Sequence, residues 1–120
     1  IKKWVAALRS GKFRRGESYL ATRKVSKHVE YCCLGVLCEL AAKEGVVKRV
    51  SRLSDVAYGN ERANYYLPSE VKNWAGLRTA HGSRGSGKQT LAELNDDGRS
   101  FNKIADVIES DVDSLFFKES

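Results

Sequence analysis

The sequence predicts a single compact α+β domain, mainly α-helical, with a small β-hairpin and about four helices around a buried cysteine-containing helix. A chain of 120 residues with 42% hydrophobic and 30% charged residues has the length and composition of one globular domain, residues 1–120. The segment 31–41, YCCLGVLCELA, is almost wholly apolar, as a core helix is. Near both ends of the chain, apolar residues recur at three and four positions, which is typical of amphipathic helices.

The amino-terminal quarter predicts a helix followed by a basic arm. Apolar residues at helical spacing over residues 1–10 precede Gly11, which is placed to end the helix, and Trp4 is expected in the core. Residues 12–30 have no sustained period. We therefore expect an irregular arm or hairpin on the surface, in which residues 18–22 pair as a short strand.

In the middle of the chain, the apolar segment predicts a helix over residues 31–44, closed by Gly45 and surrounded by the rest of the domain. The alternating, β-branched segment 46–53 predicts a strand. Residues 64–67 are expected to return beside it after the turn at 58–60. These two strands form the predicted hairpin.

Capping residues predict the remaining helices. A third helix is expected from Pro68 to Gly76, with Trp74 in the core, before a polar Gly/Ser-rich loop. Thr90 and Glu93 match a capping box for the short segment LAEL. Ser100 is expected to cap a last helix whose apolar face holds Phe101, Ile104, Ala105, Ile108, Val112, Leu115 and Phe116. There is no internal repeat and no linker long enough to separate two domains.

Membrane and secreted classes are disfavoured. The longest near-apolar run is about three helical turns, short of the roughly 20 residues that a bilayer requires, and the amino terminus lacks the apolar core of a signal peptide. Three cysteines, two of them adjacent, do not form a disulfide framework, which favours a reducing compartment. We expect a soluble intracellular protein with no membrane partner.

Charge is unevenly distributed within the net charge of +6. Residues 1–30 hold nine Lys or Arg against two Glu, whereas residues 91–120 hold eight acidic against three basic residues. A basic segment with interleaved aromatic residues can neutralise phosphates and stack on bases. The alternative is that the basic and acidic ends lie against each other or form a solvated face. The candidate nucleic-acid or anion-binding residues are Lys12, Arg14, Arg15, Tyr19, Arg23, Lys24, Lys27, Arg84 and Lys88.

The last two candidates come from the segment GSRGSGKQ, residues 82–89, which matches the phosphate-binding loop GxxxxGK[ST] except at Gln89. Gln89 lacks the hydroxyl that holds magnesium, and no parallel-sheet pattern surrounds the loop. Nucleotide hydrolysis is therefore disfavoured. A flexible basic loop, in which Arg78, Arg84 and Lys88 touch an anion, is the preferred interpretation.

The cysteines allow two readings. Cys32 or Cys33 at a helix start, followed along the chain by His81 and Asn95, fits a cysteine hydrolase in outline. Buried cysteine acting as a small apolar residue is the preferred interpretation. A zinc site that also uses His28 lacks paired CxxC spacing, so no metal is expected.

The segment LNDDGRSF, residues 94–101, offers oxygen ligands for calcium at Asn95, Asp96 and Asp97. Its register fails, because Ile104 stands where a calcium-binding loop has its bidentate Glu. We expect a turn and a helix cap instead. The sequence implies no cofactor.

Four blocks, KWVAALRSGKF, YCCLGVLCELA, YLPSEVKNWAGL and LAELNDDGRSFNKIADVIE, resemble a family of small uncharacterised proteins of tailed bacteriophages. The resemblance covers most of the chain apart from the basic arm and the glycine loop. It implies a setting, the cytoplasm of an infected host bacterium, but no catalytic residue and no mechanism.

The leading functional expectation is a non-enzymatic protein that binds nucleic acid or a nucleotide signal in host takeover or counter-defence. The first alternative is an inhibitor that docks on a host enzyme or defence complex through Tyr58, Tyr65 and Tyr66, which are candidate aromatic anchors. The second alternative is the cysteine hydrolase. The apolar pattern is compatible with a monomer and with a homo-oligomer.

Overall fold

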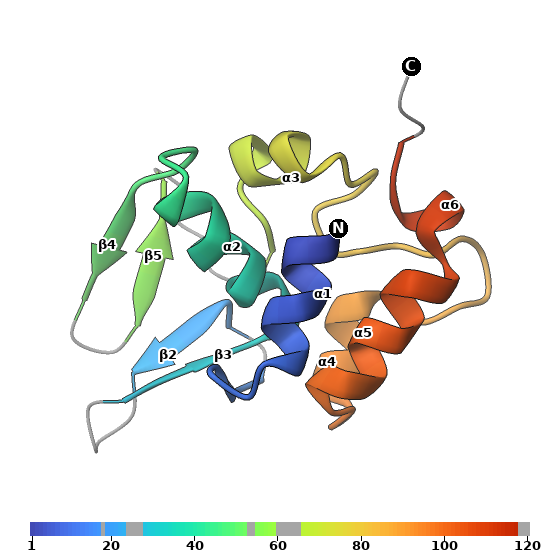
Figure 1. The fold of residues 1–120 in the computed structure, drawn as a ribbon, viewed down its shortest axis with the longest axis horizontal. Helices are drawn as coiled ribbons and strands as arrows, with labels where there is room; N and C mark the ends of the chain where they lie inside the picture. The colour runs from blue at the N-terminus through green and yellow to red at the C-terminus, as the bar shows by residue number, and fades with distance from the viewer. Residues whose placement is uncertain (18, 24–27, 53–54, 60–65, 118–120) are drawn as a thin grey trace.

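The computed structural model describes residues 1–17, 19–23, 28–52, 55–59 and 66–117, in which helices and two small sheets alternate along the chain (Figure 1). The described helices are α1 (Lys2–Arg9), α2 (Cys33–Lys43), α3 (Ser69–Ala75), α4 (Leu91–Asp96), α5 (Phe101–Ser110) and α6 (Val112–Leu115). The described strands are β1 (Arg14–Arg15), β2 (Ala21–Arg23), β3 (Val29–Tyr31), β4 (Arg49–Ser51) and β5 (Val56–Tyr58). The predicted α+β class is confirmed.

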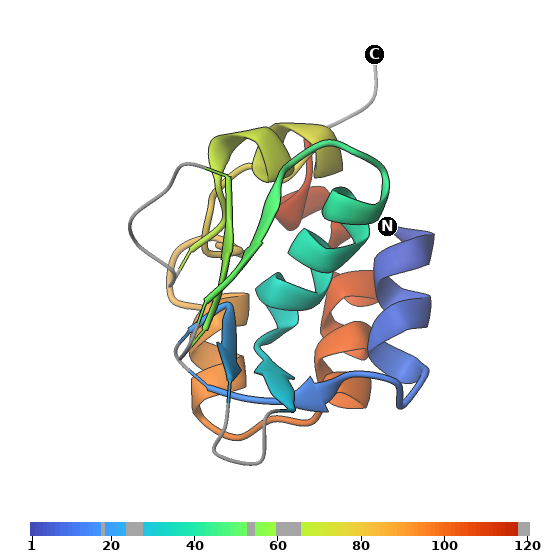
Figure 2. The same ribbon diagram turned by 90° about the vertical axis from the view of Figure 1, so that its left-hand side faces the viewer.

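Helix α2 lies at the centre of the molecule. In both views the strands lie on one side of α2, and α1 and α5 lie side by side on the other (Figures 1 and 2). Seven of its eleven residues are buried: Cys33, Leu34, Gly35, Val36, Leu37, Cys38 and Ala41. The prediction that this apolar segment is the core helix is confirmed, as is the burial of Trp4.

The basic arm is more ordered than predicted. Strand β3 lies between β1, which is parallel to it, and β2, which is antiparallel. Leu20 and Ala21 are fully buried, so the arm contributes to the core and does not simply lie on the surface. A bridge between Thr22 and Asp55 links this sheet to the hairpin of β4 and β5.

The predicted hairpin is present, but the prediction of its second strand is wrong. Strand β4 pairs with β5, with Arg49 opposite Tyr58, so the chain returns immediately and not at residues 64–67. Of those residues, 64 and 65 lie outside the described part of the chain, and Tyr66 and Leu67 are not in a strand. The segment Val56–Tyr58 is fully buried, which is why it lacks the polar alternation that marks a half-exposed strand.

The predicted caps are confirmed at Thr90 and Ser100, whose side chains accept hydrogen bonds from the backbone amides of Glu93 and Lys103, each the third residue of its helix. The last helix is divided, because Asp111 leaves helical dihedral angles between α5 and α6. Trp74 is not in the core. It is 40% exposed, because α3 is short and buries only Val71.

A close backbone approach at Gly35 joins α2 to the three-stranded sheet. A Cβ atom at Gly35 would lie 1.8 Å from the carbonyl oxygen of Leu20, a distance that no packing can accept. That carbonyl also accepts a hydrogen bond from the Cys32 amide at 3.1 Å. Glycine is therefore required here by steric contact with the chain entering β2.

Within the described residues, no helix combines the length and the apolar character that crossing a membrane requires.

We predict that Gly35→Ala lowers the free energy of unfolding by about 3 kcal/mol or more, because β2 must move away from α2. In an unconstrained helix the same change increases the free energy of unfolding by about 1 kcal/mol. A decrease therefore indicates the steric contact between Gly35 and Leu20. Urea unfolding monitored by circular dichroism measures it. Gly11→Ala is the control. Gly11 has a positive φ but open space around it, so only the modest backbone cost is expected. Equal losses at the two sites contradict the packing account.

Candidate nucleic-acid interface

The candidate interface is one end of the three-stranded sheet. Strand β1 runs parallel to β3 with Arg14 opposite Glu30, so Lys12 precedes β1 near the point where β3 begins. Strand β2 is antiparallel, with Arg23 opposite Val29, so it leaves the sheet at the same end. The strand register thus gathers Lys12, Arg14 and Arg23, and we call this region the basic end.

The basic end carries two exposed cations, Lys12 and Arg14. The guanidinium of Arg14 lies 3.5 Å from Nε2 of His28, at the limit of a hydrogen bond. His28 lies in turn 3.7 Å from the carboxylate of Glu30. No carboxylate within the described ranges forms an ion pair with Lys12 or Arg14, so both charges are available to an anion.

The other predicted residues of the arm differ in what can be said of them. Tyr19 is 43% exposed, but it precedes Ala21, which lies opposite Tyr31, so it is at the other end of the sheet from Lys12 and Arg23. Phe13 is not available for stacking, because it packs edge-on against Tyr31 with ring centroids 5.4 Å apart. Three positions fall outside the described residues and side chains: Lys24, Lys27 and the side chain of Arg23.

Arg15 has a structural role that the sequence did not reveal. It lies opposite Tyr31, on the inward face of the sheet. Its guanidinium donates to the carbonyl of Asn95 at 2.7 Å and to the carboxylate of Glu17 at 2.9 Å. Arg15 and Arg14 alternate along an extended strand, so they point to opposite faces and only Arg14 is directed outward.

Arg84 and Lys88 do not join the basic end. The loop of residues 82–90 lies on the opposite side of the molecule from β2 and β3 (Figure 1). The Arg84 guanidinium donates to the carbonyl of Gln89 and to the carboxylate of Asp111, each at 2.8 Å, and Lys88 lies 3.7 Å from the same carboxylate. The hydrogen bond from Arg84 lowers the pKa of Asp111. This arginine fastens the glycine loop to the junction of α5 and α6.

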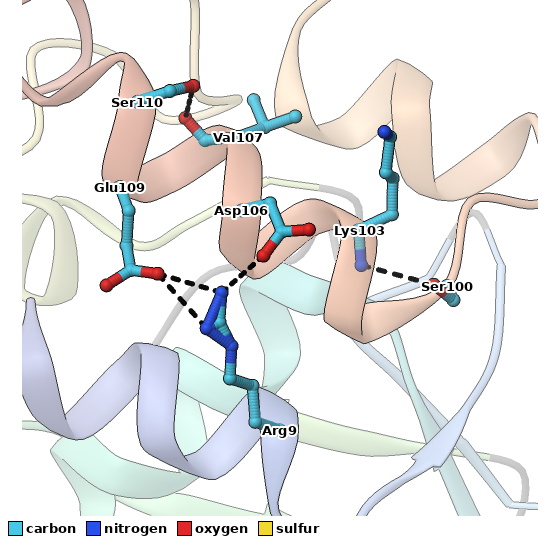
Figure 3. A network of polar contacts seen from close by, with 7 residues as sticks. All are labelled: Arg9, Ser100, Lys103, Asp106, Val107, Glu109 and Ser110. Carbon is cyan, nitrogen blue, oxygen red and sulfur yellow. Dashed lines mark hydrogen bonds and ion pairs between the residues drawn. The ribbon is translucent and has the colours of Figure 1, made fainter.

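The basic amino-terminal segment and the acidic carboxy-terminal segment of the chain meet, but through Arg9 and not through Lys12 or Arg14. Arg9 of α1 binds Glu109 at 2.8 Å and also contacts the carboxylate of Asp106, both on α5 (Figure 3). This pairing confirms part of the alternative reading of the charge pattern. It neutralises Arg9 and leaves Lys12 and Arg14 exposed.

The three thiols are buried, and none is paired in a disulfide. Burial raises the pKa of Cys32 to about 11 and raises the pKa values of Cys33 and Cys38 well above their ordinary value. The Cys32 sulfur accepts a hydrogen bond from the amide of Gly35 at 3.4 Å, and the Cys33 thiol donates to the carbonyl of Leu91 at 3.6 Å. This environment favours the neutral thiol, which is the opposite of an activated nucleophile.

Asn95 belongs to the scaffold at the other end of the sheet, where β3 leads into α2. It is fully buried, and its Oδ1 accepts from the amide of Cys33 at 3.0 Å while its Nδ2 donates to the carbonyl of Gly16 at 2.7 Å. It therefore joins α4, α2 and the end of β1 through groups that cannot reach water. Asn95 follows Cys33 and His81 in the chain, but it contacts the backbone amide of Cys33 and not the thiol.

A polar cluster around Glu39 was missed by the sequence analysis. The Glu39 carboxylate accepts from the hydroxyls of Tyr31 at 2.9 Å and Tyr58 at 3.1 Å, and from Nε of Arg49 at 2.9 Å. Burial, reinforced by the negative charge of Glu39, raises the pKa of both tyrosines. The signal in the sequence was a glutamate within an apolar helix, which required a partner.

The predicted aromatic anchors are not displayed together. Tyr58 is buried with 1% of its surface exposed, so it is unsuited to be an anchor, whereas Tyr66 is 54% exposed. Tyr65 lies outside the described residues. The middle hairpin therefore provides weaker support for docking of a host protein than the sequence suggested.

A turn ends α4, but it begins at Asp97, because the helix continues through Asn95 and Asp96 beyond the predicted segment LAEL. Asn95 is committed to backbone groups, and the carboxylate of Asp97 accepts from the side chain of Gln89. Among the described residues, no three or more His, Cys, Asp or Glu side chains lie together so that they could hold a metal ion.

Comparisons with known proteins give one match. Residues 1–112 match the model of a family described as a domain of unknown function, DUF8296. No curated protein matches, and no solved structure matches.

We predict that iodoacetamide at neutral pH modifies the native thiols slowly. A pKa of about 11 at Cys32, against 9.0 for a free thiol, reduces its thiolate fraction about a hundredfold, and burial restricts access further. Mass spectrometry of native and urea-unfolded protein measures the rates. Modification of Cys32 or Cys33 in the native protein as fast as in urea would revive the cysteine-hydrolase hypothesis.

We predict that Asn95→Ala costs about 3 kcal/mol of stability, because the Cys33 amide and the Gly16 carbonyl each lose their partner in a buried site. The exposed Asn102→Ala on α5 is the control, with an expected change within about 0.5 kcal/mol.

Asn95→Asp adds a pH test of the same site. Burial raises the folded-state pKa of the new carboxyl, and its protonated form can both accept and donate as the amide does. The variant is therefore expected to approach wild-type stability at low pH and to lose stability as pH rises through that pKa. Chemical unfolding between pH 4.5 and 8 measures the difference, and a difference independent of pH contradicts the assignment.

Proposed function

The chain belongs to the DUF8296 family, and we propose that it binds single-stranded nucleic acid or a nucleotide through the basic end of its three-stranded sheet. The observation that carries the proposal is the strand register. It brings Lys12 and Arg14 to the same sheet end from which the chain departs at Arg23 and to which it returns at His28. Lys24 and Lys27 belong to the connection between those two points.

The charge of this region supports an anionic ligand. Lys12 and Arg14 are exposed, and the described ion pairs of the chain involve other cations, such as Arg9 with α5 and Arg84 with Asp111. A phosphate can therefore approach Arg14 without displacing a carboxylate partner. Arginine suits this role because its planar donor groups match phosphate oxygens.

The size of the region favours a flexible or small ligand. Strand β1 is two residues long and β2 and β3 three each, so the sheet end presents a few cations and not a long groove. Tyr19 is exposed, but it precedes Ala21, which pairs with Tyr31 at the other end of the sheet, so the cations alone define the basic end. A small group of cations suits an unpaired strand or a nucleotide better than a duplex.

The proposed action is occupancy and not catalysis. The thiols are buried with raised pKa values, which gives a cysteine-nucleophile mechanism no support. The resemblance to tailed-bacteriophage proteins suggests the setting. In that setting the ligand is a nucleic acid or nucleotide signal of the host bacterium, and its capture serves host takeover or counter-defence.

We predict that Arg14→Glu weakens binding of fluorescently labelled single-stranded DNA or RNA about tenfold, and reduces the magnitude of the salt slope by about 1. Lys12→Glu is expected to act in the same direction. Fluorescence anisotropy at several salt concentrations gives both quantities, and circular dichroism confirms folding.

The matched control is Lys43→Glu, the same charge change at an exposed residue at the far end of α2. It is expected to leave the affinity within about twofold of wild type. Equal losses for Arg14→Glu and Lys43→Glu indicate attraction by net charge alone and contradict a localised site. Arg15 is unsuited to this test, because its loss disturbs the contacts with Asn95 and Glu17.

A further inference from the structure

An apolar groove lies apart from the basic end, between the start of α1, the end of α3 and α6. Its volume is about 990 Å³. The floor is formed by buried core residues, Trp4, Leu37 and Phe116. In Figure 1 these helix ends lie at the opposite end of α1 from β2 and β3. The groove is therefore independent of the proposed nucleic-acid site.

The rim of the groove carries two large exposed side chains. Trp74 is 40% exposed and Phe117 is 56% exposed. Phe117 is held in place, because its amide donates to the carbonyl of Gly76 at 2.8 Å and the guanidinium of Arg78 lies 5.1 Å from its ring centroid. Exposed aromatic side chains beside an apolar depression, one of them held by its neighbours, are typical of an interaction surface.

The groove walls are charged in opposite senses. Lys2 and Lys3 line the α1 wall, where Lys3 is already paired with Glu44, and Asp113 lines the α6 wall. A two-fold association places the cationic wall of each chain against the anionic wall of its partner, and lets the rim aromatics of each enter the depression of the other. The same face thus carries protruding aromatic side chains, a groove that can receive them, and charges of both signs. These are the features of a surface that can bind a second copy of itself.

One mode of peptide binding does not fit this groove. Its walls are built from helices α1, α2, α3 and α6 and the chain that follows α3 and α6, and none of the named strands lines it. Addition of an extended peptide to a sheet edge is therefore not available here. We propose that this face binds a second copy of the chain, forming a symmetric dimer that leaves both basic ends free.

Sedimentation and light scattering across a concentration series test the proposal. The expected result is a mass approaching twice the 13.4 kDa of the chain at high micromolar concentration. Trp74→Asp and Phe117→Asp are each expected to raise the dimer dissociation constant about tenfold or more. Tyr66→Asp is the matched control, because Tyr66 is equally exposed but does not line the groove.

A charge exchange tests the orientation without touching the apolar residues. Lys2→Glu and Asp113→Lys are each expected to weaken self-association, because each sets like charges against each other across the two-fold axis. A mixture of the two variants is expected to restore association as a heterodimer. Lys3 is left intact because it pairs with Glu44 at 2.8 Å.

Three results overturn the proposal. These are a monomer at the highest concentration reached, a dimer that persists in both aspartate variants, and a mixture of the charge variants that associates no better than either alone. If the protein is monomeric, the groove does not bind a second copy of the chain.

Discussion

The first turn of α2 is held by buried hydrogen bonds from three directions, and the positions of the neighbouring elements depend on it. The Cys33 amide donates to Asn95, the Cys33 carbonyl accepts from Nε1 of Trp4 at 2.9 Å, and the Cys32 amide donates to the carbonyl of Leu20. These bonds come from α4, α1 and the start of β2. Because each partner is buried, replacing a bond by water requires opening the core.

This junction also explains how a two-residue strand such as β1 is positioned. The Gly16 amide donates to the carbonyl of Tyr31 at 2.6 Å, and the Gly16 carbonyl accepts from Asn95. Arg15 adds a bond to the carbonyl of Asn95. The inward face of the strand is thus fixed by three contacts, and Arg14, one residue earlier, is directed outward. Arg15 and Gly16, which hold the segment in place, therefore directly follow Arg14, the candidate binding residue.

The sequence predicted most helices because their signals are local. Helical periodicity, the capping box at Thr90 and the serine cap at Ser100 are all readable within a few residues. The sheets were harder to predict, because strands of two or three residues are shorter than the alternation that identifies a strand. The second hairpin strand was misplaced for a related reason: Val56–Tyr58 is buried on both faces and shows no alternation.

The candidate site was predicted as a stretch of cations, and the structure separates them by role. Arg14, Arg15 and Arg84 are equivalent in a charge count. In the structure Arg14 is exposed, Arg15 is bonded to Asn95 on the inward face of the sheet, and Arg84 holds a loop against Asp111. Those roles depend on partners 27 to 80 residues away in the chain, which no local pattern reports. The partners of Glu39 and the exposure of Trp74 likewise depend on tertiary packing.

The most direct measurement of the central claim is the salt dependence of binding by the intact chain, with single-stranded DNA, duplex DNA and RNA compared side by side. Three cations of the basic end, Lys12, Arg14 and Arg23, and two that follow Arg23 in the sequence, Lys24 and Lys27, give at most five phosphate contacts. Five contacts with a single strand predict a slope of log affinity against log salt no steeper than about −3.5. A slope of about −2 to −3.5, with single strands preferred over duplex, supports a localised phosphate-binding site. No binding at low salt, or an affinity insensitive to salt, contradicts it.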